Sequence, residues 1–411
     1  MKKLLMGLLA AGLVMAMALP ASAFDSEFGG YWRTRAYLQR DFTGNDTEKQ
    51  DVQQVDTRTR LFYTAVFSED FKFVNAFEFN NTWGDTVGGD IGTDGTGIFR
   101  IKHSYANFNL GPVNFLVGLQ PRVLNRGFVF DDDFAGLAVT FKGEGFQIPF
   151  IWMKAYEGGM GKDKNDNDVD YYALKPTFNF AGGSVTPTLA YIYSKDASAW
   201  SATTGDKEVK VWLAGADVDL KFGPSTVWFT GIYEGGDAEL VSPAGHSMSV
   251  EAYLLALGGT FVAGAADIHG QVFYATGDDT TTEDYEAFFI PKGQSYYWAE
   301  IMGLGTFDNQ ASANSCADKI SNILAANLGF GFKVSDALTI KADVWHARLA
   351  EDNAAGDDTL GTEVDLKVTY SLMKNLNLDL IGAYLFADDA TYKGTNDQNP
   401  YEIGTQLSFR F

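Results

Sequence analysis

Basic side chains occur in pairs two residues apart in the first third of the chain. Eight of the ten arginines lie between residues 33 and 126. In an extended strand, residues i and i+2 point to the same side, so each pair puts two positive charges on one face. Such a face creates a positive field that selects charged solutes; the alternative is that a water-facing wall simply needs polar residues. The pairs are Arg33 with Arg35, Arg58 with Arg60, and Arg100 with Lys102.

Residues that carry other chemistry are sparse. Cys316 is the only cysteine, so the chain has no disulfide framework and no haem-attachment motif. The four histidines show no paired metal spacing. Residues 163–168 resemble the start of a calcium loop, but Asp168 stands where the loop needs glycine and Leu174 where it needs glutamate. No local pairing of nucleophile and base appears, so we predict no catalytic residues, no metal site, no cofactor and no enzyme.

The elements that would position the basic pairs are long β-strands. In the segments 360–372 and 375–387, apolar and polar residues alternate with period two. Eighteen such segments follow one another along the chain. A barrel of sixteen strands remains an alternative, because the segments 113–120 and 134–142 are short. The expected strands are 28–40, 52–67, 71–82, 98–109, 113–120, 134–142, 145–157, 169–180, 184–195, 207–221, 225–235, 247–262, 266–276, 326–334, 337–349, 360–372, 375–387 and 401–411.

Connections between these segments alternate in length. Short ones include 68–70, 111–112 and 143–144, whereas 83–97 and 277–325 are long and polar. Short turns at one end and long loops at the other are typical of outer-membrane barrels. We therefore predict an all-β fold, a transmembrane antiparallel up-and-down barrel with short periplasmic turns and long extracellular loops. A chain of β-sandwiches is the soluble alternative, but strands of this length suit a tilted spanning strand better.

The two ends of the chain agree with this fold. Lys2 and Lys3 precede an apolar run and a small-residue cleavage site at 21–23, so residues 1–23 are expected to be a signal peptide and 24–411 the barrel. At the other end, the chain finishes on an alternating strand whose apolar face includes its last residue. The expected barrel-assembly signal in that strand is Glu402, Gly404, Leu407, Phe409 and Phe411.

The net charge restricts the partners. Without Lys2 and Lys3, 29 basic residues face 53 acidic ones, so the formal charge is 29 − 53 = −24. Binding to nucleic acid requires a basic surface, so it is excluded. Most of the acidic residues lie in the polar segments between strands, where they solvate loops.

The arginine pairs are expected to face the inside of the barrel. An arginine at mid-membrane on the lipid face costs about 2–4 kcal/mol, and a barrel of this size encloses an aqueous lumen. Between the fifth and sixth strands, residues 120–134 combine charges with an apolar stretch at 127–130. We expect this segment to fold into the lumen and set its carboxylates against the arginines, although the aspartates would alternatively just cap the sixth strand. Its charged residues are Arg122, Arg126, Asp131, Asp132 and Asp133.

Taken together, the loop after the fifth strand, the arginine ladder and the aromatic C-terminus resemble general trimeric porins of Gram-negative outer membranes. The segment IKHSYANFNLGPVNFLVGLQPRVLNRG looks closest to porins of sulfate- and metal-reducing bacteria. The resemblance implies a passive, water-filled channel for small hydrophilic solutes and ions. It also implies a constriction role for Arg35, Arg58, Arg60, Arg100 and the 120–133 loop. Eighteen strands are more typical of substrate-specific channels, which is a departure from the general porins.

Expected partners follow from the same interpretation. They are outer-membrane lipid and lipopolysaccharide, the barrel-assembly machinery, and other copies of the chain in a homotrimer. Asn75 and Asn81 share a strand face with phenylalanines, and His103 and Asn107 are expected to face outward as well, so the interface is placed on strands 1–5. The alternative function is a structural barrel, either an adhesin that uses 277–325 or the sheath of an electron conduit.

Overall fold

The computed structural model describes residues 24–47, 50–84, 98–157, 168–194, 208–238, 248–279, 281–290, 292–392 and 398–411. The expected signal peptide, 1–23, lies outside the described residues. Within them, no helix is long and apolar enough to cross a membrane.

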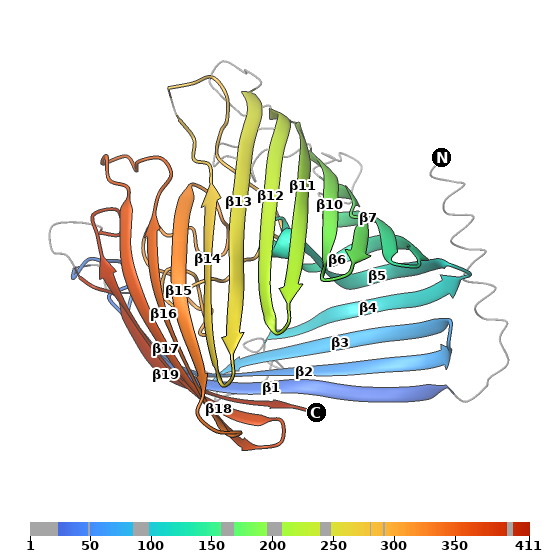
Figure 1. The fold of residues 1–411 in the computed structure, drawn as a ribbon, viewed down its shortest axis with the longest axis horizontal. Helices are drawn as coiled ribbons and strands as arrows, with labels where there is room; N and C mark the ends of the chain where they lie inside the picture. The colour runs from blue at the N-terminus through green and yellow to red at the C-terminus, as the bar shows by residue number, and fades with distance from the viewer. Residues whose placement is uncertain are drawn as a thin grey trace.

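One antiparallel sheet contains all the described strands and closes on itself. The last strand, β19, pairs with the first, β1, from Tyr31 opposite Arg410 to Arg40 opposite Tyr401. Figure 1 shows the strands following one another in chain order from β1 to β19. The strands are β1 (Asp25–Arg40), β2 (Val52–Ser68), β3 (Phe71–Thr82), β4 (Ile98–Leu110), β5 (Val113–Leu124), β6 (Phe130–Gly143), β7 (Phe146–Tyr156), β8 (Val169–Leu174), β9 (Thr177–Phe180), β10 (Gly183–Ser194), β11 (Val209–Phe222), β12 (Ser225–Ala238), β13 (Met248–Ala263), β14 (Ala266–Ala275), β15 (Ile323–Lys333), β16 (Leu338–Arg348), β17 (Thr359–Met373), β18 (Leu376–Ala387) and β19 (Tyr401–Arg410).

The segments β8 and β9 are two parts of a single barrel strand. Both pair with β7 on one side and with β10 on the other. Only Lys175 and Pro176 separate them, and proline interrupts the ladder because it has no N–H to donate. The barrel therefore has eighteen strands, which confirms the predicted all-β antiparallel fold.

The segments 113–120 and 134–142, whose shortness made a sixteen-stranded barrel an alternative, form longer strands than the sequence pattern indicated. β5 continues to Leu124 and β6 begins at Phe130, with Gln120 opposite Phe134 and Leu124 opposite Phe130. The only connection is Asn125 to Val129, which includes the 3-10 turn η1 (Asn125–Gly127). Most of the 120–134 segment is therefore paired sheet, and its tip enters the lumen as expected, where Arg126 reaches Asp219 on β11 and Phe128 lies against Phe273 on β14.

The outer face of the barrel is apolar. Large side chains such as Leu255, Phe261, Leu328, Leu366 and Phe386 are exposed to the surroundings of the barrel. Alternate residues of the same strands point inward, so a strand shows a lipid-compatible face and a more polar one. The alternation is clear on β17, where Glu363 and Asp365 are buried and the residues that follow each of them, Val364 and Leu366, are exposed.

A register shift between Ala76 and Phe77 corrects one expectation for the outer face. It leaves Lys102 on β4 without a partner on β3, so the alternation of β4 changes phase there. His103 pairs with Ala76 and lies on the inward face, and Asn107 lies two steps further along that face. The prediction that His103 and Asn107 face outward beside Ile101 was therefore wrong, because a period-two pattern cannot reveal a bulge.

The connection from β14 to β15 folds into the barrel rather than away from it. We call residues 276–322 the inner loop. Its apolar residues, including Phe288, Ile301 and Ile320, form one buried cluster with wall residues such as Ile151 and Trp345. Most wall residues of this cluster come from strand ends next to the long loops, so the lumen is partly packed at that end.

Candidate functional site

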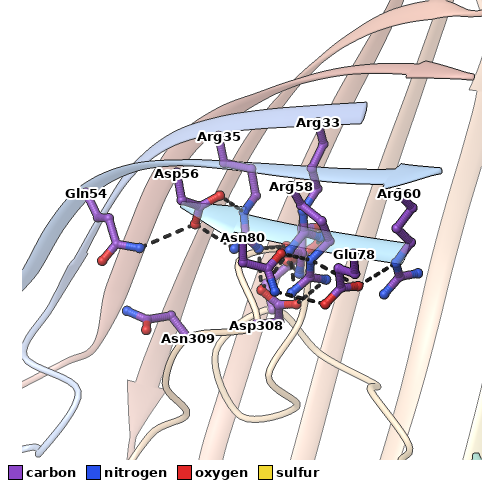
Figure 2. A network of polar contacts seen from close by, with 12 residues as sticks. Arg33, Arg35, Gln54, Asp56, Arg58, Arg60, Glu78, Asn80, Asp308 and Asn309 are labelled. Carbon is purple, nitrogen blue, oxygen red and sulfur yellow. Dashed lines mark hydrogen bonds and ion pairs between the residues drawn. The ribbon is translucent and has the colours of Figure 1, made fainter. Parts of the chain in front are cut away.

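Four arginines meet on the inner wall of β1 and β2. Arg33 lies directly opposite Arg58, and Arg60 lies opposite Tyr31 on the same face. Arg33 and Arg35 are 9% and 5% exposed. The structure thus brings together the two arginine pairs that the sequence analysis singled out, as Figure 2 shows.

Two carboxylates of the wall neutralise part of this charge. Arg35 binds Asp56 through two hydrogen bonds of 2.9 and 2.7 Å, a bidentate geometry that suits guanidinium and carboxylate. Arg60 donates to Glu78 at 2.6 Å, and Glu78 also lies 3.8 Å from Arg58.

The third carboxylate comes from the inner loop. Asp308 lies 3.1 Å from Arg33 and 3.5 Å from Arg58, and it also pairs with Arg35. Burial alone would raise the pKa of Asp308, but the positive charges of Arg33 and Arg35 lower it below its usual range. Four guanidinium groups therefore face three carboxylates (4 − 3 = +1), so the cluster keeps one net positive charge. We call these seven side chains the arginine cluster; they are Arg33, Arg35, Arg58, Arg60, Asp56, Glu78 and Asp308.

Packing next to Asp308 fixes the loop against β1 and β19. The ring of Phe307 stacks on Tyr37 with centroids 4.6 Å apart. Gly404 on β19 makes room for this contact, because a Cβ there would lie 2.5 Å from the Cβ of Tyr37 and 2.6 Å from the Phe307 ring. Arg35 also donates to the carbonyl oxygen of Thr306 at 2.8 Å. The loop backbone at 306–308 is thus held by both packing and hydrogen bonds.

Buried carboxylates on other strands hold the rest of the inner loop. Glu363 on β17 accepts hydrogen bonds from the N–H groups of Ile301 and Met302 at 2.6 and 2.8 Å. Glu234 on β12 accepts one from the N–H of Phe289 at 3.1 Å. Both glutamates are fully buried. A carboxylate that binds backbone N–H groups in this way satisfies donors that an irregular segment would otherwise bury unpaired.

The remaining predicted basic residues do not join the arginine cluster. Arg100 lies opposite Glu78 in register but is exposed, and Lys102 pairs with Asp133 at 2.5 Å. Arg122 donates to Gln120 at 3.1 Å. Arg126, in the η1 turn, crosses to β11 and binds Asp219 at 2.7 Å.

The three consecutive aspartates are not the acidic side of the arginine cluster. Asp131 and Asp132 are exposed on β6, and Asp133 binds Lys102 and His103. Asp133 does pair with Lys102 of the predicted basic ladder, but the carboxylates that oppose Arg33, Arg35, Arg58 and Arg60 are Asp56, Glu78 and Asp308, so the expectation that the three aspartates oppose the arginines was wrong. Part of the expectation holds, since Phe128 in the connection is fully buried and stacks on Tyr296 with centroids 3.9 Å apart.

Cavities lie beside the inner loop in the described part of the structure. The first has a volume of about 520 Å³ and lies between residues 297–306 and the inner wall of β12 to β17. The second, of about 570 Å³, is lined by Arg126, Lys175, Asp217 and Tyr296 among others. Among the described residues, no group of three or more histidine, cysteine, aspartate or glutamate side chains is placed to hold a metal ion.

The expected assembly residues occupy both faces of the closing strand. Glu402 is buried and accepts a hydrogen bond from Gln39 at 2.8 Å. Phe409 and Phe411 stack with centroids 5.5 Å apart, and Leu407 pairs in register with Thr34. The N–H of Gly30 donates to the carbonyl oxygen of Phe411 at 2.9 Å, so the last residue still takes part in barrel closure.

Sequence reasoning missed Asp308, Glu234 and Glu363. Nothing in the local sequence distinguishes Asp308 from the many other aspartates of the long polar connections. Glu234 and Glu363 had a weak signal, because each is an acidic residue in an otherwise alternating strand. Their role depends on which loop enters the lumen, and this is decided by contacts between distant segments.

No protein-family model matches the chain, and a search of curated proteins found no sequence match. Solved structures match its fold over nearly the whole length. A BenF-like porin from Pseudomonas fluorescens Pf-5 has a TM-score of 0.59 and 16% identity, covering 94% of this chain and 99% of that one. OccK2 (OpdF) of Pseudomonas aeruginosa in complex with glucuronate has 0.61 and 14%, covering 95% and 99%. OpdK of Pseudomonas aeruginosa with vanillate has 0.59 and 13%, covering 94% and 98%.

At this level of identity the comparison shows the fold alone, that of eighteen-stranded outer-membrane channels. The prediction that the chain is not an enzyme stays a prediction. The narrower likeness to general trimeric porins stays a prediction.

Proposed function

We propose that this protein is an outer-membrane channel through which small hydrophilic solutes diffuse passively, with a preference for anions at the arginine cluster. The observation that carries the proposal is the cluster itself, four inward arginines opposed by only three carboxylates. A positive field at a narrow point of a low-dielectric pore raises the local concentration of anions.

The solved structures of similar fold agree with this preference. OpdK was solved with vanillate and OccK2 with glucuronate, and both ligands are small carboxylate anions. The guanidinium group binds carboxylates in a planar, bidentate manner. We therefore infer that small carboxylates are among the solutes of this channel.

Conductance of the purified protein in planar bilayers tests the proposal. Steady open steps and a reversal potential of anion-selective sign are expected. A protein that inserts but never conducts would support the alternative, a structural barrel.

Two observations weigh against that alternative. An adhesin that uses 277–325 would need an exposed binding surface, but Phe288, Ile301, Met302 and Phe307 of this segment are buried inside the barrel. A sheath for a cytochrome would need a wide empty lumen, and the inner loop occupies much of it.

The further partners follow from the same proposal. We infer that the outer face contacts outer-membrane lipid and lipopolysaccharide, that the chain ends in a barrel-assembly signal, and that it forms a homotrimer through β1 to β5. Asn75 lies opposite Tyr63 and Ser104 on the outward face, so this wall is more polar than the wall of β15 to β18. Native mass measurement in mild detergent tests the trimer, and a monomer under all conditions would exclude it.

A further inference from the structure

Two rows of like charges lie next to each other on the inner wall of β16 and β17. Lys341 is directly opposite Lys367, and Asp343 is directly opposite Asp365. Like charges at opposed positions of neighbouring strands destabilise a sheet. We call the first pair the lysine row and the second pair the carboxylate row.

Both rows line the 520 Å³ cavity beside the inner loop. Glu300 of the inner loop lines the same cavity and lies next to the carboxylate row, where its N–H donates to Asp365 at 3.4 Å. The apolar part of the lining is aromatic and consists of Trp228, Tyr297, Trp298 and Trp345. The cavity therefore combines a positive end, a negative end and flat apolar surface.

Existing contacts leave the charges of the rows only partly compensated. Lys367 lies 3.6 Å from Asp379, and Asp343 accepts a hydrogen bond from Asn327 at 2.6 Å and contacts His269 at 3.0 Å. Asp365 is 7% exposed; its Oδ1 accepts no hydrogen bond from a protein donor among the described residues, and its carboxyl lies within hydrogen-bond reach of the buried carboxyl of Glu363, a second acidic group without a cation beside it. An unpaired carboxylate oxygen in a buried wall is costly unless a ligand supplies a donor.

In the described part of the chain, no group of three or more histidine, cysteine, aspartate or glutamate side chains is placed to hold a metal ion. An ammonium group fits better, because it carries three N–H donors and does not need a closed shell of ligands. The lysine row lies two residues along the strands from the carboxylate row, so it would bind a carboxylate group of the same ligand. Two residues of extended strand span roughly 7 Å, which is comparable to the length of an extended dipeptide.

We propose that this cavity binds a small zwitterion with an apolar body, of about dipeptide size. Its ammonium group lies toward the carboxylate row and Glu300, its carboxylate toward the lysine row, and its apolar side chain against the tryptophans. The inference deepens the proposed channel function by naming a second solute class, and it rests on that function only for the route by which the solute enters.

Binding of glycyl-leucine to the purified barrel in detergent, followed by tryptophan fluorescence, tests the proposal without any need for conductance. N-acetyl-glycyl-leucine lacks the ammonium group and glycyl-leucinamide lacks the carboxylate. Each analogue is expected to bind about tenfold more weakly, since a charge-assisted hydrogen bond contributes about one factor of ten or more. Equal binding of glycyl-leucinamide would mean a cation site only, and no binding of glycyl-leucine would overturn the proposal outright.

Variants separate recognition from folding. Lys341→Gln and Asp365→Asn are each expected to weaken glycyl-leucine binding about tenfold. Because each also removes a like-charge repulsion, the thermal stability of the empty barrel should stay the same or rise. Glu27→Gln is the matched control, since Glu27 lies on the same face of β1 as Arg33 but does not line the cavity.

A loss of stability with unchanged binding in Lys341→Gln would show a purely structural role for the rows and refute the proposal. The two proposals can fail independently. A barrel that does not conduct in bilayers would contradict the channel function, yet it can still bind glycyl-leucine in detergent.

Discussion

The carboxylate of Asp308 lies 3.1 Å from the guanidinium group of Arg33, although 275 positions separate the two residues in the chain. The contact joins the inner loop to the first strand of the barrel. It sets both the charge of the arginine cluster and the position of the loop in the lumen, so most of the predictions below depend on it.

Asp308→Asn should make the channel more anion-selective. The substitution removes one negative charge and raises the net charge of the arginine cluster from +1 to +2. We expect the anion-to-cation permeability ratio to rise by about twofold or more, measured as a reversal potential in a salt gradient. Asp336→Asn, at an exposed short turn, is the control; an equal shift in both variants would contradict the assignment.

Replacing Arg58 and Arg60 by glutamine should have the opposite effect. The net charge of the cluster falls by two, from +1 to −1, and the reversal potential should move toward cations. Lys333→Gln is the matched control because Lys333 is an exposed lysine at the short-turn end of β15. An unchanged potential in the double variant would show that the arginines do not face the permeation path.

Docking of the inner loop should depend on pH through Asp308. Because neighbouring arginines lower the pKa of this carboxyl relative to the unfolded chain, the pairing is complete above the ordinary aspartate pKa of about 3.9. It is lost as the pH falls further, through the lowered pKa at which the carboxyl of the folded protein becomes protonated. Single-channel current noise should therefore stay constant from pH 7 to about pH 4 and increase below it. A transition near pH 6, or the same acid transition in Asp308→Asn, would show that another group is responsible.

Glu363→Gln should loosen the inner loop. Glutamine has one acceptor oxygen and places an amide donor against two backbone N–H groups, which costs roughly 1–3 kcal/mol. Tryptic cleavage after Lys292 or Lys319 in the loop should become faster in the folded barrel. Glu283→Gln changes an exposed glutamate of the same loop and should leave the rate unchanged; no difference between the two variants would exclude the clamp.

Deletion of Phe411 should slow barrel closure. It removes two backbone hydrogen bonds to Gly30, a loss of about 1–3 kcal/mol. The heat-modifiable shift of the folded barrel on a gel measures the effect. Phe411→Tyr keeps the backbone and the ring and should assemble normally, whereas normal assembly of the deletion would argue against a role of the last residue.

The strands could be predicted from the sequence because their two faces meet different surroundings. The alternation in 360–372 needs no tertiary information, and β17 is found at Thr359–Met373. That Arg33 and Arg58 lie on neighbouring strands was also accessible, since successive strands of an up-and-down barrel pair with each other. Chain order and alternation together were therefore enough for the barrel and for the basic side of the arginine cluster.

The acidic side was not accessible for a physical reason. The inner loop enters the lumen because Phe307 packs on Tyr37 over Gly404 and because Glu363 binds two of its N–H groups. Each of these contacts joins segments far apart in the chain, and no periodic pattern records them. The 120–134 segment, predicted as the constriction loop because it combines charges with phenylalanines, does place its tip in the lumen, but its aspartates lie on β6 and do not pair with the arginine cluster.

The measurement that tests the account most directly is the reversal potential of the wild-type protein in a planar bilayer across a salt gradient. We predict steady open channels with a potential of anion-selective sign, reduced or inverted when Arg58 and Arg60 are replaced by glutamine. Absence of conductance from a correctly folded, inserted barrel, or a cation-selective potential that these substitutions do not move, would contradict it.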